Sequence, residues 1–95
     1  MKMLSMRFKS NKSAEELRQL SEAGFEKFRS LNGLIQKYYV KNEETGEVGG
    51  VYLWESEQAL SEYLNGPIIK SLPERFELKE PLSIEIVDVQ YTLRT

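Results

Sequence analysis

Apolar residues alternate at the start of the chain. Leu4, Met6 and Phe8 occupy every second position of segment 3–8, a period typical of a strand with one buried face. From Ser13 to about Leu31 the apolar positions recur at spacings of three and four, which predicts a helix. The residues on this helical face are Leu17, Leu20, Gly24, Phe28 and Leu31. Ser13 followed by Glu16 is a capping-box pattern, so the helix is expected to begin there.

The middle of the chain predicts a hairpin. Asn32-Gly33 ends the helix, with glycine in the left-handed conformation. Segment 34–41 is expected to form a strand, polar residues 42–46 a loop, and segment 47–54 a returning strand. Within the first of these strands, alternation separates two faces. One face carries Leu34, Gln36, Tyr38 and Val40, and the other carries Ile35, Lys37 and Tyr39.

The last third of the chain completes the pattern. Ser56 is expected to cap a second helix that Gly66-Pro67 stops. Segment 68–76 is expected to form a short helix or turn, and a last strand is expected over Leu82–Leu93. The order β-α-β-β-α-β predicts an α+β, ferredoxin-like fold, in which a four-stranded antiparallel sheet carries its helices on one face. Residues 1–95 are expected to form a single domain.

The sheet face away from the helices is expected to be apolar. Segment 51–54 is apolar or aromatic at every position, and Val87, Val89, Tyr91 and Leu93 alternate near the end of the chain. A second copy of the chain would cover such a face, so we expect a homodimer formed through the sheet faces. The alternative is that these residues lie at exposed strand ends.

Composition narrows the chemistry. The chain has 13 Lys and Arg, 15 Asp and Glu, no His and no Cys, which excludes imidazole proton shuttles, thiolate nucleophiles and metal sites built from either residue. No apolar run approaches the length of a membrane span, so a cytoplasmic protein with no membrane partner is expected. The positive charge gathers in residues 1–41, which hold nine Lys and Arg against four Glu.

The strand 49–54, Gly-Gly-Val-Tyr-Leu-Trp, followed by Glu55-Ser56-Glu57-Gln58-Ala59, resembles the strand-to-helix junction of the dimeric α+β barrel superfamily. The whole chain is similar to one branch of it, the small mono-oxygenases related to antibiotic-biosynthesis mono-oxygenases. The resemblance implies two ferredoxin-like protomers whose sheets close into a barrel. It also implies a cofactor-independent reaction of O₂ with an aromatic compound.

The resemblance carries over at some pocket positions only. Relatives have an Asn and a Trp four residues apart on this strand; Trp54 matches the Trp, whereas Gly50 stands at the Asn position. The pocket tyrosine of the following helix falls at Leu60, with Tyr63 three residues further on. Haem-degrading members of the superfamily use a His ligand, which this chain lacks.

Trp54 is the leading candidate for a pocket residue, because indole can stack on a flat substrate and donate a hydrogen bond. Tyr52 is expected to share its wall, and Tyr38 of the neighbouring strand could extend it. Tyr63 could act on a substrate proton, and Phe28 could add an aromatic surface. Each of these residues has an alternative role in the core.

Two charged residues complete the candidate site. Asp88 lies between two valines, so burial in a covered sheet could raise the pKa of its carboxyl group and make it a base; the alternative is a strand-end carboxylate paired with a lysine. Arg75 could hold an anionic group of the substrate. No metal ligands and no cofactor are expected.

Three functions are compatible with these features of the sequence. The first is a cofactor-independent mono-oxygenase that acts on a small aromatic or quinol-like compound. The second is a non-catalytic homodimer that binds a small aromatic ligand in the same cavity. The third is RNA binding, since RNA-recognition domains share this strand order, but segment 48–54 lacks their aromatic motif and the net charge is −2, so no nucleic-acid partner is expected.

Overall fold

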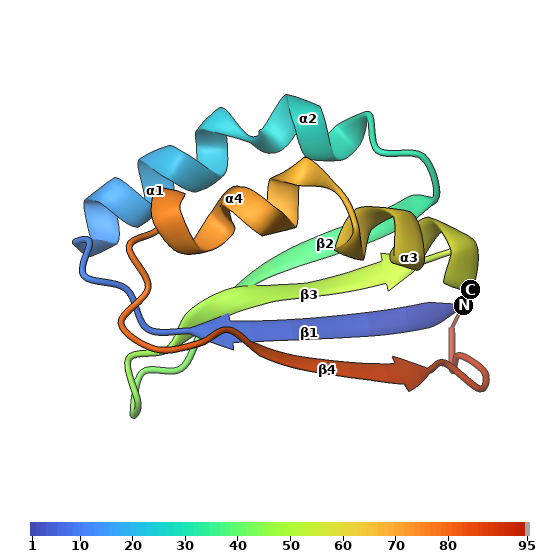
Figure 1. The fold of residues 1–95 in the computed structure, drawn as a ribbon. Helices are drawn as coiled ribbons and strands as arrows, with labels where there is room; N and C mark the ends of the chain where they lie inside the picture. Colours follow the sequence, from blue (N-terminus) through green and yellow to red (C-terminus); the bar gives the residue numbers. More distant parts are fainter. Residues whose placement is uncertain (95) are drawn as a thin grey trace.

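A computed structural model describes residues 1–94 of the 95-residue chain. The elements are β1 (Lys2–Phe8), α1 (Ala14–Ala23), α2 (Phe25–Arg29), β2 (Leu34–Lys41), β3 (Val48–Trp54), α3 (Glu57–Leu64), α4 (Pro67–Arg75) and β4 (Ser83–Asp88). The strands form one antiparallel sheet in the order β2-β3-β1-β4, and all four helices lie on one face of it (Figure 1). The predicted ferredoxin-like fold is therefore confirmed.

The buried core lies between the two central strands and the later pair of helices. Strands β1 and β3 contribute alternate residues, as the period of two predicts. The buried side chains are Leu4, Met6, Phe8, Tyr52, Trp54, Leu60, Tyr63, Ile69 and Leu72. Helices α1 and α2 contribute no fully buried residue, although Phe28 of α2 is partly buried and packs against the core.

The predicted first helix is divided in two. Ser13 caps α1 through the expected capping box with Glu16. However, α1 ends at Ala23 and α2 begins after Gly24, a residue whose backbone freedom weakens a helix. The helical segment also ends at Arg29, before Leu31. Gly33 has the predicted left-handed backbone, with φ 83°.

The C-terminal half differs from the prediction at two places. Segment 67–75 is a full helix, α4, which begins with a proline at its first position. The last strand ends at Asp88 and does not extend to Leu93, because β4 pairs only with β1 and the final pair is Lys2 with Asp88. Beyond it, the Val89 amide donates a hydrogen bond to the Met1 carbonyl. No helix within residues 1–94 has the length and hydropathy to cross a membrane.

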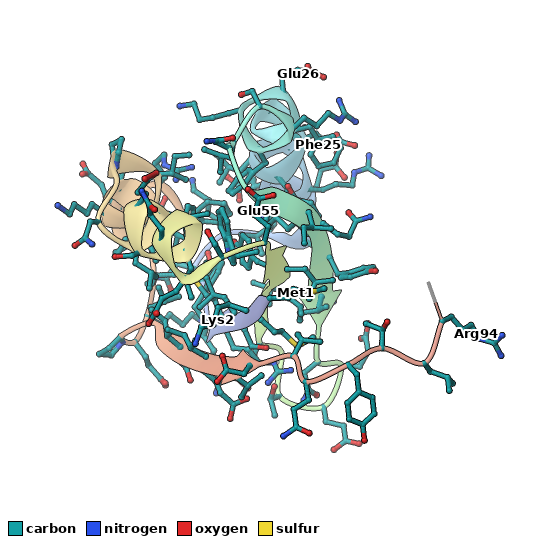
Figure 2. All side chains as sticks on the ribbon, turned by 90° about the vertical axis from the view of Figure 1, so that its right-hand side faces the viewer. Met1, Lys2, Phe25, Glu26, Glu55 and Arg94 are labelled. Atoms are coloured by element: carbon teal, nitrogen blue, oxygen red, sulfur yellow. The ribbon has the colours of Figure 1, made fainter. Side chains whose placement is uncertain are left out.

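The face of the sheet away from the helices, which we call the open face, is rich in apolar side chains. Strand register places Met3, Val51, Leu53, Tyr38 and Val87 on it. Tyr38 is 54% exposed and Val87 46% exposed. In Figure 2 the labelled Arg94 lies on the side opposite α3 and α4, so the C-terminal segment leaves the sheet toward the open face.

A β-bulge in β2 corrects the predicted faces of that strand. The register shifts between Leu34 and Gln36, so Leu34 pairs with Trp54 and packs against the core, and Gln36 moves to the open face with Tyr38. One extra residue is enough to exchange the two faces of a strand. Lys37 and Tyr39 consequently lie on the helix side of the sheet.

Candidate active site

Four of the predicted site residues form one aromatic cluster beneath the helices. Tyr52 and Trp54 stack with their ring centres 6.4 Å apart, and Tyr63 lies 5.5 Å from Tyr52 and 5.1 Å from Trp54. Phe28 of α2 lies 6.0 Å from Tyr52. The Tyr63 hydroxyl donates a long hydrogen bond of 3.4 Å to the Tyr52 hydroxyl. The sequence therefore identified a real cluster of rings.

Besides Tyr52, two further members of this cluster lie in the core. Trp54 is 1% exposed, and within residues 1–94 its indole Nε1 has no hydrogen-bond partner. Tyr63 is also buried. The structure thus gives both residues the core position that was their alternative role, and any contact with a ligand would need the surrounding side chains to move.

A cleft of about 550 Å³ opens beside the cluster. Its walls come from α1 and the start of α2 on one side and from β2 and β3 on the other, and Leu72 and Phe76 close one end. Its aromatic lining consists of Phe8, Phe25, Tyr39, Tyr52 and Phe76. Tyr52 is the one predicted site residue that lines this cleft. Because α1 has no buried residue, the cleft occupies the space between that helix and the sheet.

A smaller cleft of about 350 Å³ lies on the other side of Phe25. It is lined by Phe28 and shares Phe25, Lys37 and Tyr39 with the larger cleft. Lys37 therefore reaches the boundary between the two spaces. Clefts of these sizes match those that bind small organic molecules.

Lys37 is the functional candidate that the sequence analysis missed. Its Nζ lies 3.5 Å from the ring centre of Phe28, 4.2 Å from that of Tyr39 and 4.7 Å from that of Tyr52. Burial, together with the positive charge of Arg75, lowers the pKa of Lys37 from 10.5 to about 7. The sequence signal was a lysine directly before two tyrosines on a strand, but the bulge decided which way it points.

The tyrosines of the site keep their protons. Burial raises the pKa of Tyr52 and of Tyr63 above the usual value for a phenol, and burial also raises that of Tyr39. The Tyr39 and Tyr52 hydroxyls line the larger cleft and can donate hydrogen bonds to a ligand near neutral pH, but they are poor bases. Lys37 is the group lining the clefts that can exchange a proton in this range.

Three predicted site residues lie elsewhere. Asp88 forms an ion pair with Lys2 at the strand end, and the hydrogen bond from Lys2 lowers the pKa of its carboxyl group, so the expected raised pKa is wrong. Tyr38 pairs with Val51 on the open face and cannot share a wall with Tyr52. Arg75 donates hydrogen bonds of 2.9 Å to the Ser71 hydroxyl and the Ile68 carbonyl. It therefore acts on the site through its charge.

The pKa of Lys37 predicts how stability depends on pH. Between about pH 7 and pH 10 the unfolded chain holds a proton on Lys37 that the folded chain has lost, so the free energy of unfolding should rise with pH, by about 1 kcal/mol per pH unit. Below about pH 7 both states are protonated and this rise disappears. Urea unfolding of Lys37→Met should show a flatter profile from pH 7 to 9 than the parent protein. Equal slopes would contradict the assignment.

The site combines an aromatic wall, an amine and a positive rim. Cations that line the larger cleft besides Lys37 are Lys12, Arg18 and Lys41, against the single carboxylate of Glu22. Within residues 1–94 no three acidic side chains gather closely enough to hold a metal ion. The arrangement suits a flat aromatic molecule that carries an acidic hydroxyl or another anionic oxygen.

The fold recurs in solved structures of oxygenases. A "putative antibiotic biosynthesis monooxygenase" from Deinococcus radiodurans is 17% identical with a TM-score of 0.77, and the match covers 100% of this chain and 98% of that one. SnoaB from Streptomyces nogalater, a cofactor-independent oxygenase, is 12% identical with a TM-score of 0.76, covering 99% and 97%. ActVA-Orf6 from Streptomyces coelicolor, a monooxygenase solved with the ligand Nanaomycin D, is 18% identical with a TM-score of 0.73, covering 99% and 91%.

Comparison of the sequence with known proteins identifies a family. No curated protein matches the chain, and the structural matches alone show the fold at these identities. A family model described as "Putative mono-oxygenase ydhR" matches residues 3–93, which is nearly the whole chain. The chain belongs to this mono-oxygenase family.

Proposed function

We propose that this protein is a cofactor-independent mono-oxygenase that oxidises a small aromatic or quinol-like compound with O₂, as a homodimer in the cytoplasm. The observation that carries the proposal is the larger cleft, which joins five aromatic rings to one partly buried amine. The resemblance to SnoaB, a cofactor-independent oxygenase, supports a reaction in which the substrate itself reduces O₂.

The proposed reaction requires the protein to bind the substrate and to favour its ionised form, and it does not require a reactive protein group. A deprotonated quinol or anthrone gives an electron to O₂, and the two radicals combine to a hydroperoxide that loses water. One oxygen atom becomes the new carbonyl group, and the other leaves as water with two substrate hydrogens. The protein has to orient the ring, favour the anion and keep bulk water out of the cleft.

Oxygen consumption with a panel of anthrones and naphthoquinols tests the function. We expect protein-dependent turnover in air and none under nitrogen. Leu17 lines the cleft from α1, so Leu17→Trp should fill the space and lower kcat/KM by at least about tenfold. Gln19→Trp places the same side chain on the exposed side of that helix and should preserve turnover. Absence of O₂-dependent turnover with every compound would contradict the proposal.

The homodimer is supported by the open face. Its apolar residues come from all four strands, and the segment after β4 adds Tyr91 and Leu93, which are 86% and 94% exposed in the single chain. A second copy offers the same apolar surface under two-fold symmetry and would cover both.

A non-catalytic ligand-binding protein is the second candidate. It is favoured by Gly50, which stands at the amide position of the related enzymes, and by the burial of Trp54 and Tyr63. Native mass spectrometry of the freshly purified protein would then show a retained aromatic ligand, and the O₂ electrode would show no turnover of it.

A further inference from the structure

The amine of Lys37 sits in a cage of aromatic rings built by three different elements. Phe28 comes from α2, Tyr39 from β2 and Tyr52 from β3, and all three ring centres lie within 4.7 Å of Nζ. Ring faces attract an ammonium ion, so the cage stabilises the protonated form. The side chain is therefore held in one place and opens onto both clefts.

Gly50 makes this position possible. A side chain at residue 50 would start 3.2 Å from Lys37 Cε and 2.9 Å from Tyr52 Cε1. Both distances are too short for an ordinary carbon contact. The stem of Lys37 and the ring of Tyr52 thus occupy the space that a side chain at residue 50 would need. Relatives carry an amide at this strand position. In this chain the amine of Lys37 therefore lies in the region where relatives have the amide.

Lys37 has no negative partner within residues 1–94. None of the five ion pairs in this part of the chain includes it. The charged and titratable groups that face it or its cage are Tyr39 of β2, Tyr52 of β3, Tyr63 of α3, Arg75 of α4 and Arg29 of α2. None of them is a carboxylate. Among residues 1–94, Glu22 of α1 is the one carboxylate that lines the larger cleft, and Lys12, Arg18 and Lys41 outnumber it there, so an anion supplied by a ligand would meet an uncompensated amine.

We propose that Lys37 accepts the proton from an acidic aromatic hydroxyl bound in the larger cleft and then pairs with the oxyanion that forms. The O–H bond of the ligand breaks, the electron pair stays on its oxygen, and a new N–H bond forms on Nζ. The ligand class is a flat phenol, naphthol or enolised anthrone. This inference rests on the proposed function for its place in catalysis, although the binding step requires no O₂.

The electrostatic surroundings suit a group that must both gain and lose a proton. Burial and Arg75 favour the neutral amine before the ligand arrives, whereas the new oxyanion favours the ammonium afterwards, which the three rings can also hold. A base works best when its pKa lies near the working pH. The hydroxyls of Tyr39 and Tyr52, which line the larger cleft and stay protonated because burial raises the pKa of each, can donate to the same oxyanion.

A chromogenic phenol tests the step without turnover. The probe is 4-nitrophenol, whose anion absorbs visible light, titrated with pH in the presence of saturating protein. We expect the bound phenol to ionise at lower pH than the free one, with its ionisation constant raised at least about tenfold. In Lys37→Met the bound phenol should ionise at higher pH than the free one. Lys37→Arg keeps a permanent cation and should retain the shift while losing turnover of quinols.

Two controls make the result specific. Lys27→Met is the same substitution on the exposed side of α2, outside both clefts, and it should titrate like the parent protein. Glu22→Gln removes the carboxylate that lines the cleft and should also keep the shift. Circular dichroism and thermal unfolding confirm that each variant is folded.

The outcomes separate this inference from the proposed function. If the parent protein does not bind the nitrophenol, or if folded Lys37→Met retains the shift, the inference is overturned. If Glu22→Gln abolishes the shift, the carboxylate is the proton acceptor and the inference is overturned as well. A Lys37-dependent shift without O₂ consumption would contradict the proposed oxygenase function but not the proton acceptance by Lys37. Undiminished turnover in Lys37→Met would contradict the role of Lys37 in catalysis but not the oxygenase function.

Discussion

Replacing Gly49 with alanine is expected to destabilise the fold by about 3 kcal/mol. A Cβ atom at this position would lie 1.8 Å from the carbonyl oxygen of Met6, 2.8 Å from its carbonyl carbon and 3.1 Å from Arg7 Cα. These atoms belong to the backbone of β1, which runs through the middle of the sheet. They cannot move without separating β1 from β3. Urea unfolding monitored by circular dichroism measures the loss.

Gly50→Ala is the matched control for this prediction. Its Cβ would meet side chains, Tyr52 Cε1 at 2.9 Å and Lys37 Cε at 3.2 Å, and side chains can adjust more easily than a neighbouring strand. We expect a loss of about 1 kcal/mol, clearly smaller than that of Gly49→Ala. Equal losses, or a Gly49→Ala protein as stable as the parent, would show that β1 and β3 are not held as closely as the structure indicates.

Val51→Glu is expected to dissociate the proposed homodimer. Val51 lies in the middle of the open face, between Ser5 of β1 and Tyr38 of β2. Two-fold symmetry would place two unpaired carboxylates in an apolar interface, so the dissociation constant should rise at least about a hundredfold. Sedimentation velocity over a range of concentrations measures this change.

Ile86→Glu provides the control on the opposite side of the sheet. Ile86 is 45% exposed and pairs with Leu4, whose side chain points toward the helices. The Ile86→Glu substitution introduces the same negative charge at an apolar strand position that lies outside the proposed interface, so this variant should remain a dimer. A parent protein that sediments as a folded single subunit at high micromolar concentration would contradict the dimer, as would a Val51→Glu protein that associates normally.

The sequence predicted the scaffold well because its local signals are strong. The alternation of Leu4, Met6 and Phe8 gave the buried face of β1, and Ser13 and Ser56 both cap helices as expected. The end of the last strand was not predictable from its apolar residues. A strand continues only while it has a partner strand, and the pairing of β4 with β1 ends at Asp88 and Lys2, one residue from the start of the chain.

The candidate site was predicted in part. The cluster of Tyr52, Trp54 and Tyr63 follows from spacing and burial. The cleft beside it depends on the distance of α1 from the sheet, which is a tertiary property that no local pattern records. Lys37 faces inward because a bulge shifts β2 by one residue, and single-residue register changes leave little trace in sequence periodicity.

The residues that form the core and the cations that line the cleft come from different elements, and this separation affects which substitutions the fold tolerates. Within residues 1–94, the nine buried core residues come from β1, β3, α3 and α4. The cations of the cleft come instead from α1, β2 and the turn before α1. Substitutions of these cations can therefore change which molecule is accepted at little cost in folding free energy. The scaffold itself persists through extensive sequence change, because solved structures that share fewer than one residue in five with this chain have the same fold.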